Sequence, residues 1–185
     1  MCMDIGAAAY SRFLDGDDSG IEDIIAEYKD ALILYLQGFC GNLTAAEDLM
    51  EDVFVKLVVD KPPFRGKSSF KTWLFAIAGN AARDYLRKSK RRSFVPLENV
   101  SSLSDEQDLL RGHIAKENDI LVHKCMGRMN TDYRSVLYLT YFEGFTNAEA
   151  AKIMKKTTRQ IENLLYRAKQ SLKSEMLKEG FKYEE

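Results

Sequence analysis

The sequence has little cysteine and little proline, and it lacks a long run of apolar residues. Its 3 cysteines, Cys2, Cys40 and Cys125, are far apart and include no Cys-x-x-Cys pair, so a disulfide framework or a zinc site is not expected. No apolar run approaches the roughly 20 residues that a membrane span needs. The N-terminus lacks the basic start and apolar core of a secretory signal. We therefore expect a protein of the reducing cytoplasm that does not insert into a membrane.

Recognisable catalytic and cofactor-binding motifs are also missing. The 2 histidines, His113 and His123, form no convincing metal-ligand set with a cysteine or carboxylate at helical spacing, and there is no Gly-rich phosphate loop. We expect no enzymatic activity, no bound metal and no cofactor. The net charge is only −1, so binding of nucleic acid would have to come from local basic clusters.

Apolar residues recur at three- and four-residue steps through most of the 185-residue chain, which is typical of amphipathic helices. The pattern dissolves after residue 92 and resumes near residue 119. We predict an all-α fold of two small helical domains joined by a flexible linker, the second domain containing a helix-turn-helix. The expected division is a loose lead-in at 1–18, a helical bundle at 19–95, a linker at 96–116 and a helix-turn-helix domain at 117–185.

A Ser or Thr with Glu or Gln three positions later is the capping-box pattern of a helix start. Among the pairs with this spacing, four stand at the predicted helix starts: Ser19 with Glu22, Thr44 with Glu47, Thr146 with Glu149, and Thr157 with Gln160. The last two helices, separated by a tight turn at 155–156, predict the helix-turn-helix.

The second helix of that motif carries a polar stripe away from its apolar face. The stripe consists of Arg159, Asn163, Tyr166, Arg167 and Gln170. Arginine, asparagine and glutamine side chains suit base edges in a major groove. A plain helical hairpin with a solvated face would show the same pattern, so DNA recognition is one of two interpretations here.

A loop, a long helix and a basic tail follow one another between residues 64 and 92. Aromatic and basic side chains alternate in the loop and the first helical turns, which suits unstacked bases and their backbone. Phe70 and Trp73 also lie on the apolar face of the helix, so we expect them in the core. Asn80 is a poor mid-helix residue, which suggests a partner for its amide. The basic block at 87–92 suits a polyanion, although a solvated helix end would have the same composition.

Three carboxylates, Asp48, Glu51 and Asp52, line the outer face of the helix that precedes Pro62-Pro63. Such a face can dock a protein, can be merely solvated, or can supply paired carboxylates for metal or acid-base chemistry. We favour the first two interpretations, because no other candidate ligand or catalytic group accompanies the carboxylates.

Two separate stretches resemble one family, the small bacterial sigma factors of the extracytoplasmic-function group in the sigma-70 superfamily. TAAEDLMEDVF at 44–54 and the FRG, FKTWL and IA-x-N elements at 64–80 resemble the family's first conserved domain. YFEGFT, EAA and RAK within 133–172 resemble its promoter-binding C-terminal domain. The resemblance spans about 20–92 and 117–178. It implies a sigma factor that binds core RNA polymerase, recognises promoter DNA and promotes strand opening for transcription initiation.

The resemblance also implies three sets of site residues. The set for binding core polymerase is Asp48, Glu51 and Asp52. The set for the minus-ten element is Phe64, Arg65, Gly66, Lys67, Ser68, Ser69, Asn80, Arg83, Arg87, Lys88, Arg91 and Arg92. The set for the minus-thirty-five element is Lys156, Thr158, Arg159, Gln160, Glu162, Asn163, Tyr166 and Arg167. The family often has basic residues where this chain has Glu162 and Leu164, so its promoter preference does not transfer.

The implied partners are core RNA polymerase, promoter DNA and an anti-sigma protein that covers both lobes. Two other functions remain open at this point. A stand-alone helix-turn-helix regulator would leave the first lobe without a role, and an all-helical protein-interaction adaptor would not touch DNA. Stoichiometric co-purification with core polymerase separates a sigma factor from both alternatives.

Overall fold

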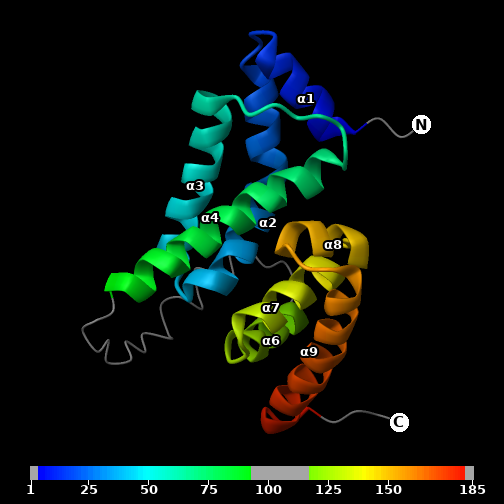
Figure 1. Ribbon diagram of the computed structural model, residues 1–185. Helices are drawn as coiled ribbons and strands as arrows, with labels where there is room; N and C mark the ends of the chain where they lie inside the picture. Colours follow the sequence, from blue (N-terminus) through cyan, green and yellow to red (C-terminus); the bar gives the residue numbers. More distant parts are fainter. Residues whose placement is uncertain (1–3, 93–116, 182–185) are drawn as a thin grey trace.

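The computed structural model describes residues 4–92 and 117–181, and every regular element in these two ranges is a helix (Figure 1). Side chains are described for residues 4–89 and 121–181. The elements are α1 (Ile5–Leu14), α2 (Ser19–Cys40), α3 (Leu43–Asp60), α4 (Phe70–Arg92), α6 (Glu117–Gly127), α7 (Thr131–Leu137), the π-helical turn η1 (Tyr138–Phe142), α8 (Asn147–Met154) and α9 (Thr158–Lys178). We call α1–α4 the N-terminal lobe and α6–α9 the C-terminal lobe. The all-helical prediction is confirmed.

Helix α1 lies within the segment that the sequence pattern left as a loose lead-in, and that prediction is wrong. Its face with Ala9, Tyr10 and Phe13 is buried. Asp4 caps two helices at once, because one carboxylate oxygen accepts from the N–H of Ala7 and the other from the N–H of Phe70, at 3.2 and 2.6 Å. The buried residues of α1 follow helical spacing, at Gly6, Ala9, Tyr10 and Phe13, but ten residues offer only one such repeat.

The N-terminal lobe packs α3 and α4 against the long central helix α2 (Figure 1). The apolar face predicted for α4 is confirmed, since Phe70, Leu74 and Ala78 are fully buried. The capping boxes predicted at 19–22 and 44–47 are wrong. Helix α2 has Asp18 as its N-cap, without a side-chain hydrogen bond. Helix α3 is capped by Asn42, so it starts earlier than predicted.

The C-terminal lobe contains the predicted helix-turn-helix, formed by α8 and α9. Both predicted capping boxes are present, with Thr146 and Thr157 each bonded to the backbone of the third helical residue. Between the helices, Lys155 adopts a left-handed conformation with φ of 55°, which is uncommon for a residue with a side chain. This single residue makes the turn short enough for α9 to fold back against α7 and α8.

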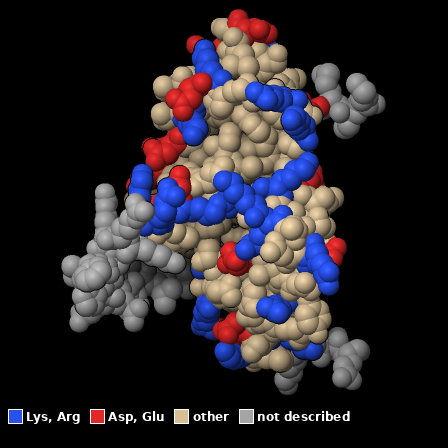
Figure 2. All heavy atoms as spheres, viewed as in Figure 1, with Lys and Arg blue, Asp and Glu red and all other residues tan. Residues whose placement is uncertain are grey.

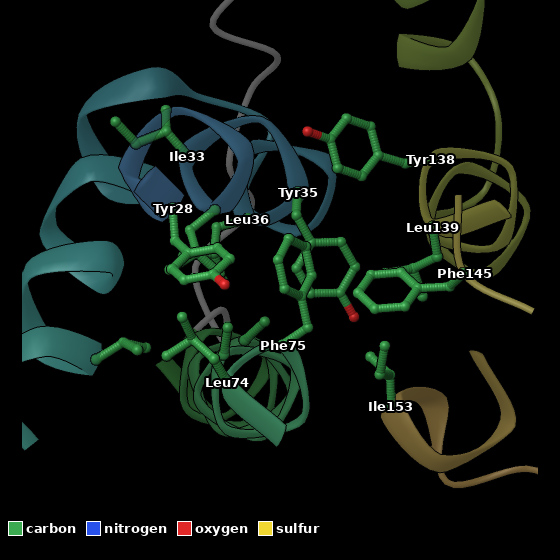
Figure 3. Packing of buried hydrophobic residues seen from close by; sticks show 14 of the residues in the cluster. Tyr28, Ile33, Tyr35, Leu36, Leu74, Phe75, Tyr138, Leu139, Phe145 and Ile153 are labelled. Atoms are coloured by element: carbon green, nitrogen blue, oxygen red, sulfur yellow. The ribbon is translucent and has the colours of Figure 1, made fainter. Parts of the chain in front are cut away.

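The two lobes share one continuous apolar core. Figure 3 shows Phe75 of α4 facing Phe145 of the C-terminal lobe, with Tyr35 and Ile153 beside them. The ring centroids of Phe75 and Phe145 are 5.1 Å apart, and those of Tyr35 and Tyr138 are 6.2 Å apart. The predicted linker at 96–116 lies outside the described residues. The two-domain pattern in the sequence did not predict how closely the lobes pack.

Candidate functional site

The outward face of α3 changes from acidic to apolar along its length. Asp48, Glu51 and Asp52 are all exposed, as the sequence predicts. The same face continues with Val55 and Val59, which are 57% and 72% exposed. Positions 48, 52, 55 and 59 follow one another at three- and four-residue steps and therefore line one side of the helix. We call the five residues together the α3 stripe. It suits a partner that offers basic and apolar groups side by side.

Sequence reasoning missed the valines of the α3 stripe. The buried residues of α3 include Leu49, Val53 and Leu57. Val55 and Val59 fall off that buried face, which is the signal that could have found them. Exposed apolar side chains next to a charged cluster are typical of a surface that binds another protein.

In the loop at 64–69, the aromatic residue at the start packs against the core, and the basic residues that follow are exposed. The ring of Phe64 lies 5.6 Å from that of Phe70 and 5.3 Å from that of Trp73, between centroids, so Phe64 serves as packing. Arg65 and Lys67 are exposed on either side of Gly66, whose φ of 65° is in the left-handed region. The part of this loop that can contact a ligand is therefore polar and basic rather than aromatic.

Asn80 has the partner that its mid-helix position predicts. The guanidinium of Arg83 donates a hydrogen bond of 2.8 Å to its side-chain oxygen. Asn80 also lines a groove of about 360 Å³ between α3 and α4. Lys56, Lys88 and Tyr85 line the same groove, together with the carboxylate residues Asp52 and Asp84. The groove therefore brings polar, aromatic and both kinds of charged groups to one place on the helix pair.

The C-terminal part of α4 is basic and open to solvent. Arg87 and Lys88 are exposed, and Arg87 forms an ion pair of 3.0 Å with Asp84. Figure 2 shows lysine and arginine atoms in a band that follows α4 across one face of the molecule toward α8. Arg91 and Arg92 are the last residues of α4, and their side chains lie outside the described part of the chain.

The polar stripe predicted on α9 is exposed. Arg159, Asn163 and Arg167 follow one another at four-residue steps and point away from the buried Ile161 and Ala168. Thr158, Glu162 and Tyr166 are exposed as well. Two residues of the predicted set have local partners: Gln160 accepts a hydrogen bond from the Thr157 N–H at 2.8 Å, and Lys156 pairs with Asp132 at 3.0 Å.

The π turn η1 explains one difference from the sequence pattern. The apolar period places Tyr141 with the inward residues, but its side chain is 58% exposed. A π turn holds more residues per turn than an α-helix, so the residues within it rotate relative to the apolar face. The Nζ of Lys169, on α9, lies 5.3 Å from the centre of the Tyr141 ring, so this exposed ring lies next to α9.

Two family models match the two lobes. Sigma-70 region 2 matches residues 24–92, and Sigma-70, region 4 matches residues 119–172. Together the two matches cover more than half of the chain. They include α3, α4 and most of α9, the helices that carry the candidate site residues described above. The chain belongs to the sigma-70 family, in the extracytoplasmic-function group. Sigma factors are transcription initiation factors that bind core RNA polymerase and promoter DNA.

Comparisons over nearly the whole length agree with this assignment. The RNA polymerase sigma-H factor of Pseudomonas aeruginosa is 26% identical over 170 residues, which cover 87% of this chain and 88% of the relative. The RNA polymerase sigma factor YlaC of Bacillus subtilis is 27% identical over 162 residues, covering 85% and 92%.

Solved structures show the same fold. Sigma factor RpoE in complex with the anti-sigma factor NepR from Bartonella quintana matches with a TM-score of 0.67 and 23% identity, covering 84% of this chain and 95% of that chain. CnrH in complex with the cytosolic domain of CnrY matches with a TM-score of 0.62 and 23% identity, covering 92% and 93%.

The lobes of this sigma factor meet where α8 crosses α4. Lys71 of α4 forms an ion pair of 2.8 Å with the carboxylate of Glu143, and its Nζ also donates to the Glu143 carbonyl at 3.0 Å. Thr72 donates its hydroxyl hydrogen to Glu149 at 3.2 Å. Arg83 donates to the carbonyl of Ile153 at 3.2 Å. Polar contacts between the lobes therefore surround the apolar contact of Phe75 with Phe145.

Burial and hydrogen bonds shift the pKa of two titratable groups of this sigma factor, Glu149 and Cys40. Burial alone would raise the pKa of Glu149, but hydrogen bonds from Thr146 and Thr72 outweigh it and lower that pKa. Burial raises the pKa of the Cys40 thiol to about 11, which leaves it protonated and unreactive at neutral pH. Among the described residues, no group of three His, Cys, Asp or Glu side chains is placed to hold a metal ion. No helix in 4–92 or 117–181 is both long and apolar enough to cross a membrane.

Proposed function

We propose that this sigma factor binds core RNA polymerase through the α3 stripe and recognises promoter DNA through two separate surfaces, one on each lobe. The observation that carries the proposal is that one chain combines an exposed helix-turn-helix with a loop and helix of polar and basic character. In this account residues 19–95 bind polymerase and the minus-ten element, and residues 117–185 bind the minus-thirty-five element. The protein acts in the cytoplasm, where polymerase and promoter DNA are found.

The minus-ten surface is proposed to act on a base that leaves the stack. Flipping a base costs a few kcal/mol of unstacking, which a pocket and neutralisation of the backbone charge must offset. The polar loop at 64–69 and the groove beside Asn80 supply polar contacts. Arg83, Arg87 and Lys88, with Arg91 and Arg92, supply positive charge. The polymerase supplies the nucleotide chemistry, so this chain needs no catalytic group.

The minus-thirty-five surface is proposed to read an intact duplex. Side chains at 159, 163 and 167 share one face of α9, and arginine and asparagine can each make paired hydrogen bonds to a base edge in the major groove. The N-terminus of α9, with Thr158 and the nearby Lys156, suits a DNA phosphate because the unpaired N–H groups there point outward.

An anti-sigma protein is proposed as a further partner. The two solved structures described above each contain a second protein, one described as an anti-sigma factor and the other as the cytosolic domain of CnrY. Pull-down of this sigma factor from its native host tests the proposal. Recovery of the protein only free or with core polymerase would count against a dedicated inhibitor.

Run-off transcription with purified core enzyme on genomic fragments tests the function as a whole. Addition of the full chain is expected to produce discrete transcripts, and the chain is expected to co-purify stoichiometrically with core polymerase. Duplex binding without polymerase binding would identify a stand-alone regulator instead. Binding of neither would leave a protein-interaction adaptor.

A further inference from the structure

We propose that α1 is a positioning element for the minus-ten surface, because it holds both ends of the loop at 64–69 and thereby fixes how the loop presents its basic residues. This inference rests on the proposed function, since it assumes that the loop contacts the minus-ten element. Helix α1 has no part in the three surfaces proposed above. Its role is to orient residues that touch DNA.

The start of the loop is held by Tyr10 of α1. Its hydroxyl donates a hydrogen bond of 2.9 Å to the carbonyl of Pro62, just after α3 ends at Asp60. Tyr10 is only 1% exposed, and burial raises the pKa of its hydroxyl, which therefore stays protonated and remains a donor. The bond gives the Pro62 carbonyl a partner outside any helix. It fixes the direction in which the chain enters the loop.

The end of the loop is held by Asp4, the N-cap of α1. One carboxylate oxygen accepts from the N–H of Phe70, the first residue of α4, at 2.6 Å, and the other accepts from the N–H of Ala7 at 3.2 Å. The first N–H groups of a helix have no partner within it, and the helix dipole favours a negative charge there. A single carboxylate thus joins the start of α4 to the start of α1.

Aromatic packing connects α1 to the loop as well. The ring centroid of Tyr10 lies 5.5 Å from that of Phe70 and 5.4 Å from that of Trp73. Phe64, the first residue of the loop, packs against the same two rings. The base of the loop and the inner face of α1 therefore belong to one aromatic cluster.

Two glycines allow α1 to lie close to its neighbours. A β-carbon at Gly6 of α1 would overlap the ring of Phe70, and one at Gly20 of α2 would overlap the carbonyl oxygen of Ala9. Only a residue without a side chain fits at either position. Helix α1 is therefore seated directly against both α2 and α4, and it cannot slide without breaking these contacts.

The middle of the loop remains open between its two fixed ends. Arg65, Gly66 and Lys67 are all exposed. The Nζ of Lys152 in the C-terminal lobe reaches the Lys67 carbonyl at 3.4 Å, whereas the α1 contacts lie entirely within the N-terminal lobe. A loop that is ordered beforehand loses less conformational entropy on binding. Since its basic side chains start from a narrow range of positions, it also favours one base geometry over others. Helix α1 thereby contributes to selectivity at the minus-ten element.

A pair of matched double variants tests this role. Asp4→Asn/Tyr10→Phe removes both hydrogen bonds with little change in shape. Asparagine keeps one side-chain oxygen, so it cannot serve both helix starts, and phenylalanine keeps the ring packing. The control Asp15→Asn/Tyr141→Phe makes the same chemical changes elsewhere, because Asp15 lies at the other end of α1 and Tyr141 is an exposed ring of η1.

Two measurements are made on each double variant. Backbone ¹⁵N relaxation of the full chain reports the order of the amides at 64–69. Order parameters are expected to stay near about 0.85 in the control and to fall below about 0.6 in Asp4→Asn/Tyr10→Phe. Competition between promoters for holoenzyme then measures selectivity at single bases of each element. Minus-ten selectivity is expected to fall about tenfold and minus-thirty-five selectivity to stay unchanged, because α9 is not altered.

Equal order parameters in the two double variants would overturn the positioning role. Loss of loop order with unchanged minus-ten selectivity would overturn it as well, because the order would then serve no recognition. Equal losses of selectivity at both elements, with a lower melting temperature, would reduce α1 to a general stabiliser of the fold and would also overturn it. Failure of the wild-type chain in run-off transcription would instead refute the proposed function. The order of the loop is measured without DNA or polymerase, so the two failures can be told apart.

Discussion

The two lobes present their candidate DNA surfaces in opposite ways. Helix α9 exposes its polar stripe, and its apolar face alone packs against the rest of the C-terminal lobe. Helix α4 holds Lys71 and Arg83 in contacts with that lobe. The difference fits the two tasks proposed for them. A helix that reads an intact duplex has to be formed and exposed beforehand, whereas a surface for an opened strand is needed only after polymerase has bound.

The largest expected effect comes from the α3 stripe, whose Asp52 also lines the groove beside Asn80. Charge reversal in Glu51→Lys/Asp52→Lys is expected to weaken binding to core polymerase by about 2–5 kcal/mol, because both carboxylates would lose a basic partner and repel it. Affinity is measured by competition for core enzyme, and helix content by circular dichroism should not change. Glu22→Lys/Glu27→Lys is the matched control on exposed positions of α2. Wild-type affinity in the α3 variant would show that the α3 stripe does not bind core polymerase.

Substitutions on α9 test whether its exposed polar stripe reads bases. Replacing Arg159 or Asn163 by alanine is expected to cost about 1–3 kcal/mol of promoter binding and to relax sequence preference upstream, since each would remove a base-edge contact. Gel-shift titrations of holoenzyme on promoters with upstream substitutions measure both effects. Ser174→Ala, at an exposed position near the end of α9 and outside the polar stripe, serves as a control. An unchanged sequence preference would mean that α9 does not read bases.

A smaller and less specific effect is expected from the basic end of α4. Arg87→Ala/Lys88→Ala should weaken binding to all promoters alike, because contacts to phosphates carry no base code. The slope of log affinity against log salt should flatten by about 0.9 for each lost duplex phosphate contact. Titrations at several salt concentrations on two unrelated promoters measure the slope. A loss confined to one promoter would indicate base readout instead.

The smallest expected effect is the dependence of fold stability on the protonation of Glu149. The folded pKa of Glu149 lies below its ordinary value of 4.5. Its carboxylate therefore stabilises the fold above about pH 4.5, and that contribution is lost as the pH falls through the lowered pKa. Thermal unfolding of wild type and Glu149→Gln between pH 7 and pH 3 should show the two melting temperatures converging as the pH falls. A difference that stays constant over this range would contradict the assignment.

The sequence predicted the C-terminal lobe better than the N-terminal lobe. Both capping boxes of the helix-turn-helix formed as expected, because Thr146 and Thr157 follow turns that leave them free to cap. In the N-terminal lobe, nearby Asp18 and Asn42 became the N-caps instead. Two residues that both suit the N-cap position lie within two positions of each other there, and local propensity alone does not choose between them.

The surfaces were predictable and their mutual placement was not. Exposure of the α3 carboxylates and of the α9 stripe followed from helical periodicity. The lobe contact joins Lys71 and Phe75 of α4 to Glu143 and Phe145, which lie far along the chain, and no pattern in the sequence pairs these residues. Helix α1 was missed for a related reason, since its burial depends on contacts with α2 and α4 that are formed across the fold.

Strand opening by the Asn80 variant tests the division of labour between the lobes most directly. Holoenzymes containing the wild type, Asn80→Ala and Arg159→Ala are compared on one promoter, with closed-complex binding and permanganate reactivity of unpaired thymines measured together. Asn80→Ala should bind nearly as well as the wild type but lose thymine reactivity, whereas Arg159→Ala should lose both in proportion. Normal thymine reactivity in the Asn80 variant would contradict the account, and the stretch from Phe64 to Asn80 would then be only a scaffold for the core.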